Sequence, residues 1–326
     1  MFEGFKPRDV PLALISTFLF AVSFPILKYA LRYSPPLLFA AVRAALTAIF
    51  FVVFFALIGR RIRVPRGRAL TASILVAFFS ATYPSAAQNL GIIMLDPRSA
   101  ATVSSIFQST TPIFITVLAA VFLGEPLTRG KAFGAAVSFT GIILLSLEGK
   151  DLEALKSAAT LGGLLILSTA LSYSVSGIVT KKTLEFYPRL DLLAWSSFLS
   201  ALMYVPLMGL VWFFGVENPS PEKVLLPPVF ISLALLSFIV GGAVMIIWYR
   251  LIDSYPISRL SYFNYLLPLF AGLVSFIFMG ERLSPRSLIY AALILLGVYI
   301  VQRPKGEGVV RVNSPCSITP HAQRAR

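Results

Sequence analysis

The chain has 326 residues, of which 57% are hydrophobic and only 13% are charged, and its formal net charge is +14. Water-soluble domains rarely combine so much apolar sequence with so few charges, so a soluble enzyme or a soluble binding module is excluded. The positive residues lie mostly between apolar runs rather than on one polar face, which argues against a nucleic-acid-binding protein and predicts a membrane protein whose cations set its orientation.

Apolar runs of the length that crosses a bilayer, roughly 20 residues, recur along the whole chain. They predict an all-α integral membrane protein with ten transmembrane helices, at residues 10–31, 35–58, 69–93, 99–123, 131–147, 161–181, 190–213, 229–250, 257–279 and 286–302. The basic residues before the first run are followed by no small-residue cleavage site, so we expect this helix to remain uncleaved. Residues 303–326 contain too little apolar sequence to fold, and we expect a disordered tail.

The distribution of cations predicts the orientation in the membrane. If residues 1–9 are cytoplasmic, most of the 28 Lys and Arg residues fall on the cytoplasmic side, including a cluster at residues 60–68. Cytoplasmic loops of multi-pass proteins carry such an excess. We therefore expect a multi-pass protein of the cytoplasmic membrane with both termini, and the tail, in the cytoplasm.

An internal repeat divides the chain into two related halves. Residues 112–128, PIFITVLAAVFLGEPLT, align without a gap over residues 268–284, PLFAGLVSFIFMGERLS, and share a proline and a Gly-Glu pair. Chance would match Leu, Ile and Val, but not these together. We infer a five-helix repeat at residues 10–147, an external linker at 148–160 and a second repeat at 161–302. Because five is odd, the second half is inverted, as in many secondary transporters.

At this point the sequence resembles the EamA-like branch of the drug/metabolite transporter superfamily. The resemblance covers residues 10–302 and rests on the repeated Pro–apolar–Gly-Glu pattern, FPILK at 24–28, Arg43 and QNLG at 88–91. It implies ten helices in two inverted five-helix repeats and a carrier of metabolites such as amino acids. We expect a secondary transporter of small organic metabolites, working in the direction of export by alternating access around a central cavity.

Two prolines mark the candidate transport site. Pro112 and Pro268 lie deep within apolar runs, lack an N–H and crowd the carbonyls four residues earlier, which belong to Gln108 and Asn264. We predict helix breaks there, with two amide side chains near mid-membrane. Interrupted membrane helices are tolerated where they line a cavity, but amides also bond neighbouring helices together, and both readings remain open.

Other polar residues share helix faces with these amides or lie on neighbouring helices. The further cavity candidates are Ser105, Ser261, Tyr265, Tyr83 and Ser172. Small residues also allow helices to pack closely, which competes with a cavity role for the serines. Trp248 and Tyr249 could stack on an aromatic or planar cargo, but Trp and Tyr gather at membrane interfaces, so the interface is the default role for these two residues near a helix end.

Arg43 lies about 12 Å along the second helix from its predicted outer end, by the rise of 1.5 Å per residue. A charge at that depth needs a partner or a watery path. It could hold a substrate carboxylate, or it could snorkel toward the membrane surface or clamp backbone carbonyls of neighbouring helices. The sequence does not choose between these roles.

The residues that are missing from the spans narrow the function. No span has a clearly central Asp, Glu or His, which disfavours carboxylate-based proton coupling. The sequence also lacks a G-x-x-x-x-G-K-S/T phosphate loop, so we do not expect ATP hydrolysis. The single Cys316 and His321 fall in the tail, so neither a metal nor another cofactor is expected.

The alternatives are an intramembrane enzyme acting on a lipid, which would need acidic metal ligands or a His/Ser arrangement, and a passive channel or structural membrane subunit. We find no such enzymatic cluster and do not expect an enzyme. The expected partners are a small-molecule substrate and the lipid bilayer, and no nucleic acid is expected. The sequence is compatible with a homodimer as well as with a monomer.

Overall fold

The structure is a computed structural model, and it describes residues 5–95, 100–126, 128–147, 161–218, 220–279 and 285–302. The described residues form helices joined by turns and short irregular connections, without a strand. The predicted linker 148–160, the predicted tail 303–326 and Glu281 of the repeat pattern lie outside the described residues.

Each predicted span coincides with one helix or with one series of consecutive helices. The first half contains α1 (Asp9–Ala30), α2 (Pro36–Leu57), α3 (Arg68–Val76), the π-helical segment η1 (Ala77–Thr82), α4 (Tyr83–Met94), α5 (Ala100–Gln108), α6 (Thr111–Leu123) and α7 (Arg129–Leu147). The second half contains α9 (Leu161–Thr183), α10 (Arg189–Phe213), α11 (Pro221–Val224), α12 (Pro227–Ala234), π-helical η2 (Leu235–Val244), α13 (Met245–Ser254), α14 (Ile257–Ser261), the 3-10 turn η3 (Tyr262–Leu266), α15 (Leu267–Met279) and α16 (Pro285–Gln302).

Seven helices within the described residues are long and apolar enough to cross a membrane. Large apolar side chains on the outside of the bundle are exposed, among them Leu57 at 80% and Phe213 at 83%. Such an outer surface suits contact with lipid, because a soluble protein would not leave so much apolar area in water. The full count of ten crossings and the inversion of the second half stay predictions.

Proline and glycine set the ends of several helices. Pro36 and Pro112 stand in the first turns of α2 and α6, where a missing N–H costs nothing. Gly59, Gly124 and Gly215 follow α2, α6 and α10 with φ near +65°, a left-handed conformation that ends a helix and favours glycine. These local signals place the boundaries of the apolar segments.

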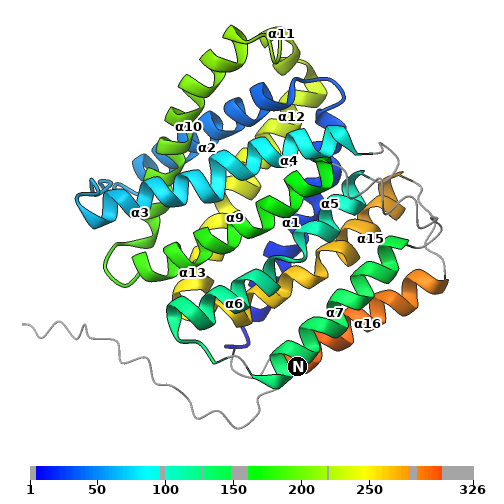
Figure 1. The fold of residues 1–326 in the computed structure, drawn as a ribbon. Coiled ribbons are helices and arrows are strands. Elements are labelled where there is room, and N and C mark those ends of the chain that lie inside the picture. Colours follow the sequence, from blue (N-terminus) through cyan, green and yellow to red (C-terminus); the bar gives the residue numbers. More distant parts are fainter. Residues whose placement is uncertain are drawn as a thin grey trace, which may run out of the picture.

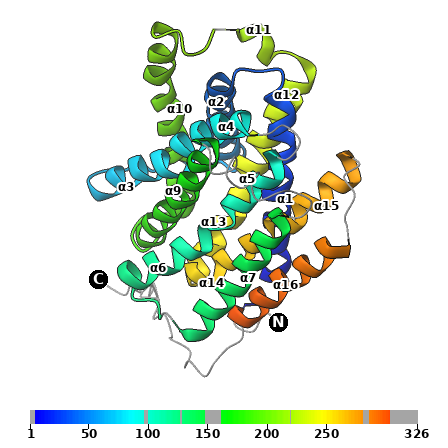
Figure 2. The same ribbon diagram turned by 45° about the vertical axis from the view of Figure 1, so that its right-hand side comes forward.

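The helices form a bundle with one pair set apart from its centre. In Figures 1 and 2, α7 and α16 lie side by side at one edge of the molecule, while α1, α5 and α9 run through the middle. A Cβ on Gly297 of α16 would lie only 2.5 Å from the backbone nitrogen of Ser138 in α7. The two helices therefore pack closely because glycine leaves room for the neighbouring backbone.

A second close contact joins the halves. A Cβ on Gly91 of α4 would lie 2.8 Å from the carbonyl oxygen of Gly162 in α9, and a Cβ on Gly162 would lie 2.9 Å from the carbonyl oxygen of Gly91. Each glycine thus occupies space that a side chain on the other would need, which fixes how closely α4 and α9 approach.

Two apolar clusters fill opposite ends of the bundle. One packs Phe51 and Phe55 at the end of α2 against Leu192 at the start of α10. The other packs Phe39 at the start of α2 against Val211 near the end of α10. By the predicted orientation, the first cluster is at the cytoplasmic end and the second at the external end.

Candidate functional site

A cavity of ≈ 230 Å³ lies in the bundle between the two apolar clusters. The residues that line it come from α1, α2, the α4, α5, α6, α9, α10 and α13 regions and the broken α14–α15 segment. Both π-helical segments, η1 and η2, contribute to its wall. Single π turns are common at functional sites because they displace side chains from the regular helical positions. Both halves of the chain therefore build one central chamber.

The helices are interrupted at both prolines. α5 ends at Gln108 and α6 begins at Thr111, whose hydroxyl donates to the Gln108 carbonyl across 2.6 Å. In the second half the chain forms the 3-10 turn η3, in which the N–H of Leu267 donates to the Asn264 carbonyl. A hydroxyl and a tighter turn thus satisfy the carbonyls that proline deprives of their usual donors.

The two amide side chains line the cavity but differ in their bonding. Gln108 donates through Nε2 to Thr111 Oγ1 at 3.0 Å, and its Oε1 accepts from the hydroxyl of Thr169 in α9 at 2.9 Å. The side chain of Asn264 makes no hydrogen bond to the part of the chain that the structure describes. Gln108 therefore joins helices as well as facing the cavity, whereas the Asn264 amide is available to a solute.

Arg43 of α2 also lines the cavity. Two hydroxyls, on Thr47 at 2.9 Å and on Ser237 at 3.2 Å, donate to its backbone carbonyl, which holds α2 against η2 at this level. Its guanidinium forms neither a hydrogen bond nor an ion pair with the described residues. The ionisable side chains near it are the phenols of Tyr173 and Tyr204.

The serine candidates separate into cavity and packing residues. Ser261 lines the cavity together with Asn264. Ser105 is fully buried in α5 outside the lining, and Ser172 donates to the carbonyl of Phe79 at 2.8 Å, which joins α9 to η1. A serine of this kind bonds one helix to another rather than meeting a solute.

The tyrosine candidates do not reach the cavity. Tyr83 shares a hydrogen bond of 2.7 Å with the hydroxyl of Ser168 in α9. Tyr265 is fully buried, with its ring stacked on that of Tyr262 at a centroid distance of 5.9 Å. Both side chains are therefore part of the packing between helices.

Two aromatic residues of α13 line the cavity, although the sequence places them by default at the membrane interface. They are Trp248 and Tyr249, and their place in the lining suits the stacking role rather than the interfacial role favoured by their position near a helix end. The ring of Phe20 in α1 packs edge-on against Trp248 at 5.6 Å. The signal that could have found them is helical spacing, because Met245 and Ile252 complete the same i, i+3, i+4, i+7 face.

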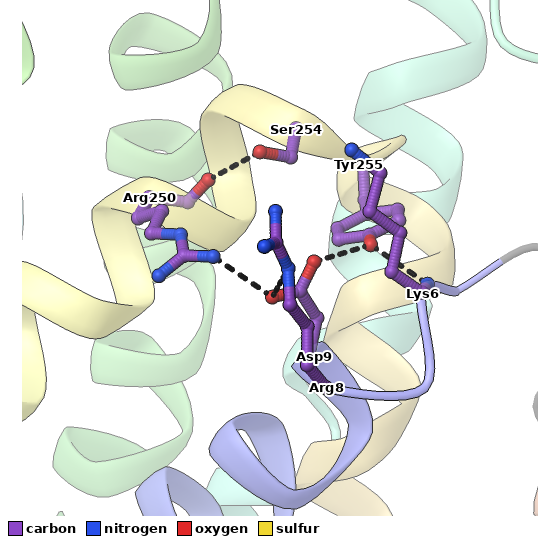
Figure 3. Close-up of polar contacts among 6 residues, drawn as sticks. All are labelled: Lys6, Arg8, Asp9, Arg250, Ser254 and Tyr255. Carbon is purple, nitrogen blue, oxygen red and sulfur yellow. Dashed lines mark hydrogen bonds and ion pairs between the residues drawn. The ribbon is translucent and has the colours of Figure 1, made fainter.

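Charged residues meet at the end of the bundle that is predicted to be cytoplasmic. Figure 3 shows the carboxylate of Asp9, at the start of α1, between the guanidinium of Arg250 in α13 and the hydroxyl of Tyr255. Arg250 donates at 3.1 Å and Tyr255 at 2.7 Å, and Asp9 is only 3% exposed. Burial, and then the bond to Asp9, raise the pKa of Tyr255, so its phenol remains a donor. Asp9 thereby joins the first half to the second.

Further contacts at this end also cross between the halves. Arg60, after α2, forms a 2.7 Å ion pair with Asp191 at the start of α10. The carboxylate of Glu125, after α6, accepts the N–H groups of Ile257 and Ser258 at 2.9 and 3.2 Å and so caps α14. Acidic groups are favourable at a helix N-terminus, where N–H groups lack partners. These contacts join the two halves at this end of the bundle.

Within the described ranges, no three His, Cys, Asp or Glu side chains gather where a metal ion could bind. Asp9, Asp191 and Glu125 are bonded to arginines, a phenol and backbone N–H groups. The polar side chains that line the cavity, among the described residues, carry hydroxyls, amides, aromatic rings and the guanidinium of Arg43.

Comparison with known proteins adds a family to this geometry. The model of the EamA-like transporter family matches the chain twice, at residues 9–147 and 160–303. A relative from Salmonella typhimurium named "Probable amino-acid metabolite efflux pump" is 26% identical, over 90% of this chain and 94% of its own length. An "Uncharacterized transporter" of Archaeoglobus fulgidus is 25% identical, over 91% of this chain and 99% of its own length.

This chain is also similar to a third named relative and to a solved structure. A "Probable terminal-alkyne amino-acid exporter" of Streptantibioticus cattleyicolor is 28% identical, over 74% of this chain and 76% of its own length. A crystal structure with a TM-score of 0.69 and 15% identity covers 90% of this chain and 94% of its own, which shows a shared fold alone.

Proposed function

The chain belongs to the EamA-like transporter family, and we propose that this multi-pass membrane protein moves small organic metabolites, amino acids or related compounds, out of the cell by alternating access. The family is one of transporters rather than enzymes. Names of relatives that refer to efflux of amino-acid metabolites support the cargo class and the direction. The membrane we propose is the cytoplasmic one, with both termini inside.

The central cavity is the observation that carries the proposal. Side chains from both halves line it, and its ≈ 230 Å³ is below the roughly 300–1,000 Å³ of pockets for drug-sized ligands. That size suits a solute as small as an amino acid. Its wall combines apolar surface with amides and hydroxyls, such as those of Asn264 and Ser261, which could orient a polar solute.

The contacts at the predicted cytoplasmic end suit an inner gate. In alternating access, two inverted halves rock against each other, so contacts between halves must separate when the cavity opens to that side. The Asp9–Arg250 and Arg60–Asp191 pairs join elements of different halves there. Both aspartates are buried, so separating either pair before water reaches the carboxylate is costly, which favours the closed state of this gate.

A passive channel is the alternative from another class. A channel needs a continuous open path, whereas this cavity has an apolar cluster at each end. A carrier saturates and exchanges one solute molecule for another, and a channel does neither.

The experiment is uptake by proteoliposomes that contain the purified protein, tested with each of the twenty amino acids at several concentrations. We expect saturable uptake of at least one amino acid above the rate of empty liposomes. Uptake equal to that of empty liposomes for all of them would remove amino acids from the proposed cargo, and a linear dependence on concentration would indicate a channel.

A further inference from the structure

The unpaired charge in the cavity needs a counter-ion. Arg43 is the one Lys or Arg among the described residues that line the cavity, and no Asp or Glu lines it. The buried aspartates at the predicted cytoplasmic end already have cationic partners, since Asp9 is paired with Arg250 and Asp191 with Arg60. A cation within a membrane protein is costly unless a charge or water compensates it.

The alternative role for Arg43, clamping backbone carbonyls, has no support in the structure. The guanidinium donates to no carbonyl of the described residues, and its ionisable neighbours, Tyr173 and Tyr204, are neutral phenols. The phenol of Tyr204 is itself bonded to the carbonyl of Thr82 at 2.8 Å. The donors of Arg43 thus remain available toward the cavity.

The fixed position of Arg43 and the chemistry of its guanidinium limit which groups of a solute can bind to it. The bonds from Thr47 and Ser237 fix the backbone of Arg43, and the close approach of η2 permits no extra side chain there, since a Cβ on Gly241 would lie 2.8 Å from Thr47 Oγ1. Guanidinium is always charged and binds carboxylates through two parallel N–H···O bonds. One positive charge matches one carboxylate, whereas a phosphate dianion would leave a second charge uncompensated.

We propose that Arg43 holds the carboxylate of the transported solute, so that a carboxylate, and not an amine, is the obligatory group of the cargo. The proposal rests on the proposed transport function and names the substrate class of the same cavity. An ammonium group meets no acid in the lining and would be left to hydroxyls, amides and the face of Trp248, which are weaker and less selective partners. Removing the amine should therefore cost less than removing the carboxylate.

The test compares three solutes of the same size in proteoliposomes: L-leucine, 2-hydroxy-4-methylpentanoate, which lacks the amine, and L-leucinamide, which lacks the carboxylate. Equal potassium on both sides with valinomycin holds the membrane potential at zero, so the different net charges do not drive the flux. We expect leucine and the hydroxy acid to enter faster than into empty liposomes, and leucinamide to enter at the empty-liposome rate.

Variants of Arg43 complete the test. Arg43→Gln should lower the initial rates of leucine and the hydroxy acid roughly 10- to 100-fold, the loss expected when a charge-assisted pair is removed, and Arg43→Lys should be intermediate. The elution volume in size-exclusion chromatography and the melting temperature identify a misfolded variant. If Arg43→Gln is misfolded, the preference of the wild-type protein among the three solutes decides whether the proposal holds.

The outcomes separate the two proposals. Wild-type transport of leucinamide at the rate of leucine, or leucine transport by a folded Arg43→Gln within twofold of wild type, would overturn the role of Arg43 and leave transport standing. If none of the twenty amino acids and neither leucine analogue enters faster than into empty liposomes, both the carboxylate proposal and the proposed transport of amino-acid-like metabolites fail.

Discussion

The hydroxyl of Ser109 lies 3.2 Å from the main-chain carbonyl of Asn264, and it shares its one proton between that oxygen and the Ser105 carbonyl of its own helix at 2.7 Å. Ser109 lies where α5 gives way to α6, and Asn264 lies in the 3-10 turn before Pro268. The bond thus joins the helix break of one half directly to the helix break of the other. Because both breaks border the cavity, the site and the contact between the halves depend on the same few residues.

Removing this bond should reduce stability. Ser109→Ala removes the contact to the Asn264 carbonyl together with the bond to Ser105 of its own helix, and we expect a loss of roughly 0.6 kcal/mol, the average for hydrogen bonds between membrane helices. The control is Ser104→Ala, because Ser104 is equally buried but bonds only to Ala100 of its own helix. Melting temperatures in one detergent compare them, and equal values for both variants would contradict the importance of the bond.

The two cavity amides should respond differently to replacement. Gln108→Leu breaks the bond with Thr169, so both stability and transport should fall, stability by roughly 0.6–2 kcal/mol. Asn264→Leu breaks no described side-chain bond, so transport should fall while the melting temperature stays near that of wild type. Initial transport rates and melting temperatures are measured on the same preparations. Wild-type transport by both variants would remove the amides from the site.

Two arginine replacements test the closure at the predicted cytoplasmic end. The side chains of Arg250 and Arg189 are 39% and 41% exposed, but their partners differ, since Asp9 is 4% exposed and Asp253 is 43% exposed. Arg250→Gln leaves the buried carboxylate with only the 3.9 Å contact to the exposed Arg8 as a cationic partner, and it should cost roughly 1–3 kcal/mol. Arg189→Gln removes an exposed pair and should change stability by less than about 0.5 kcal/mol. Thermal denaturation that ranks them in the opposite order would refute this description.

The contact between α4 and α9 should be sensitive to a single methyl group. In Gly91→Ala the new Cβ would lie 2.6 Å from Ile166 Cγ1 and 2.8 Å from the carbonyl of Gly162, so we expect a loss of roughly 1–3 kcal/mol. Gly209→Ala in α10 is the matched control, because its Cβ would meet nothing within 4 Å. That variant should be neutral or slightly stabilising. A Gly91→Ala variant as stable as Gly209→Ala would contradict the close packing of α4 against α9.

Local patterns predict much of the fold. The apolar runs locate the helices, and Pro112 and Pro268 predict where two of them are interrupted, because a missing N–H is a property of one residue and its immediate neighbours. The same argument places Gln108 and Asn264 beside those breaks. Helical spacing then brings Ser261 to the face that lines the cavity.

Long-range partners could not be predicted in this way. Thr169, which bonds Gln108, is 61 residues away in the chain, and the N–H of Ile257, which binds Glu125, is 132 residues away. Helix packing decides such pairs, and nothing in the local sequence of either residue records it. The same holds for Arg43, whose lack of a described partner emerges only once the surrounding helices are in place.

The measurement that tests transport by this cavity most directly is counterflow. Proteoliposomes loaded with unlabelled L-leucine are diluted into a trace of labelled L-leucine, and the label inside is followed over time. A carrier working by alternating access predicts a transient accumulation of label above the outside concentration, absent from empty liposomes and strongly reduced by Asn264→Leu. A label that only rises to equality with the outside, at the same rate with or without unlabelled leucine inside, would contradict the carrier.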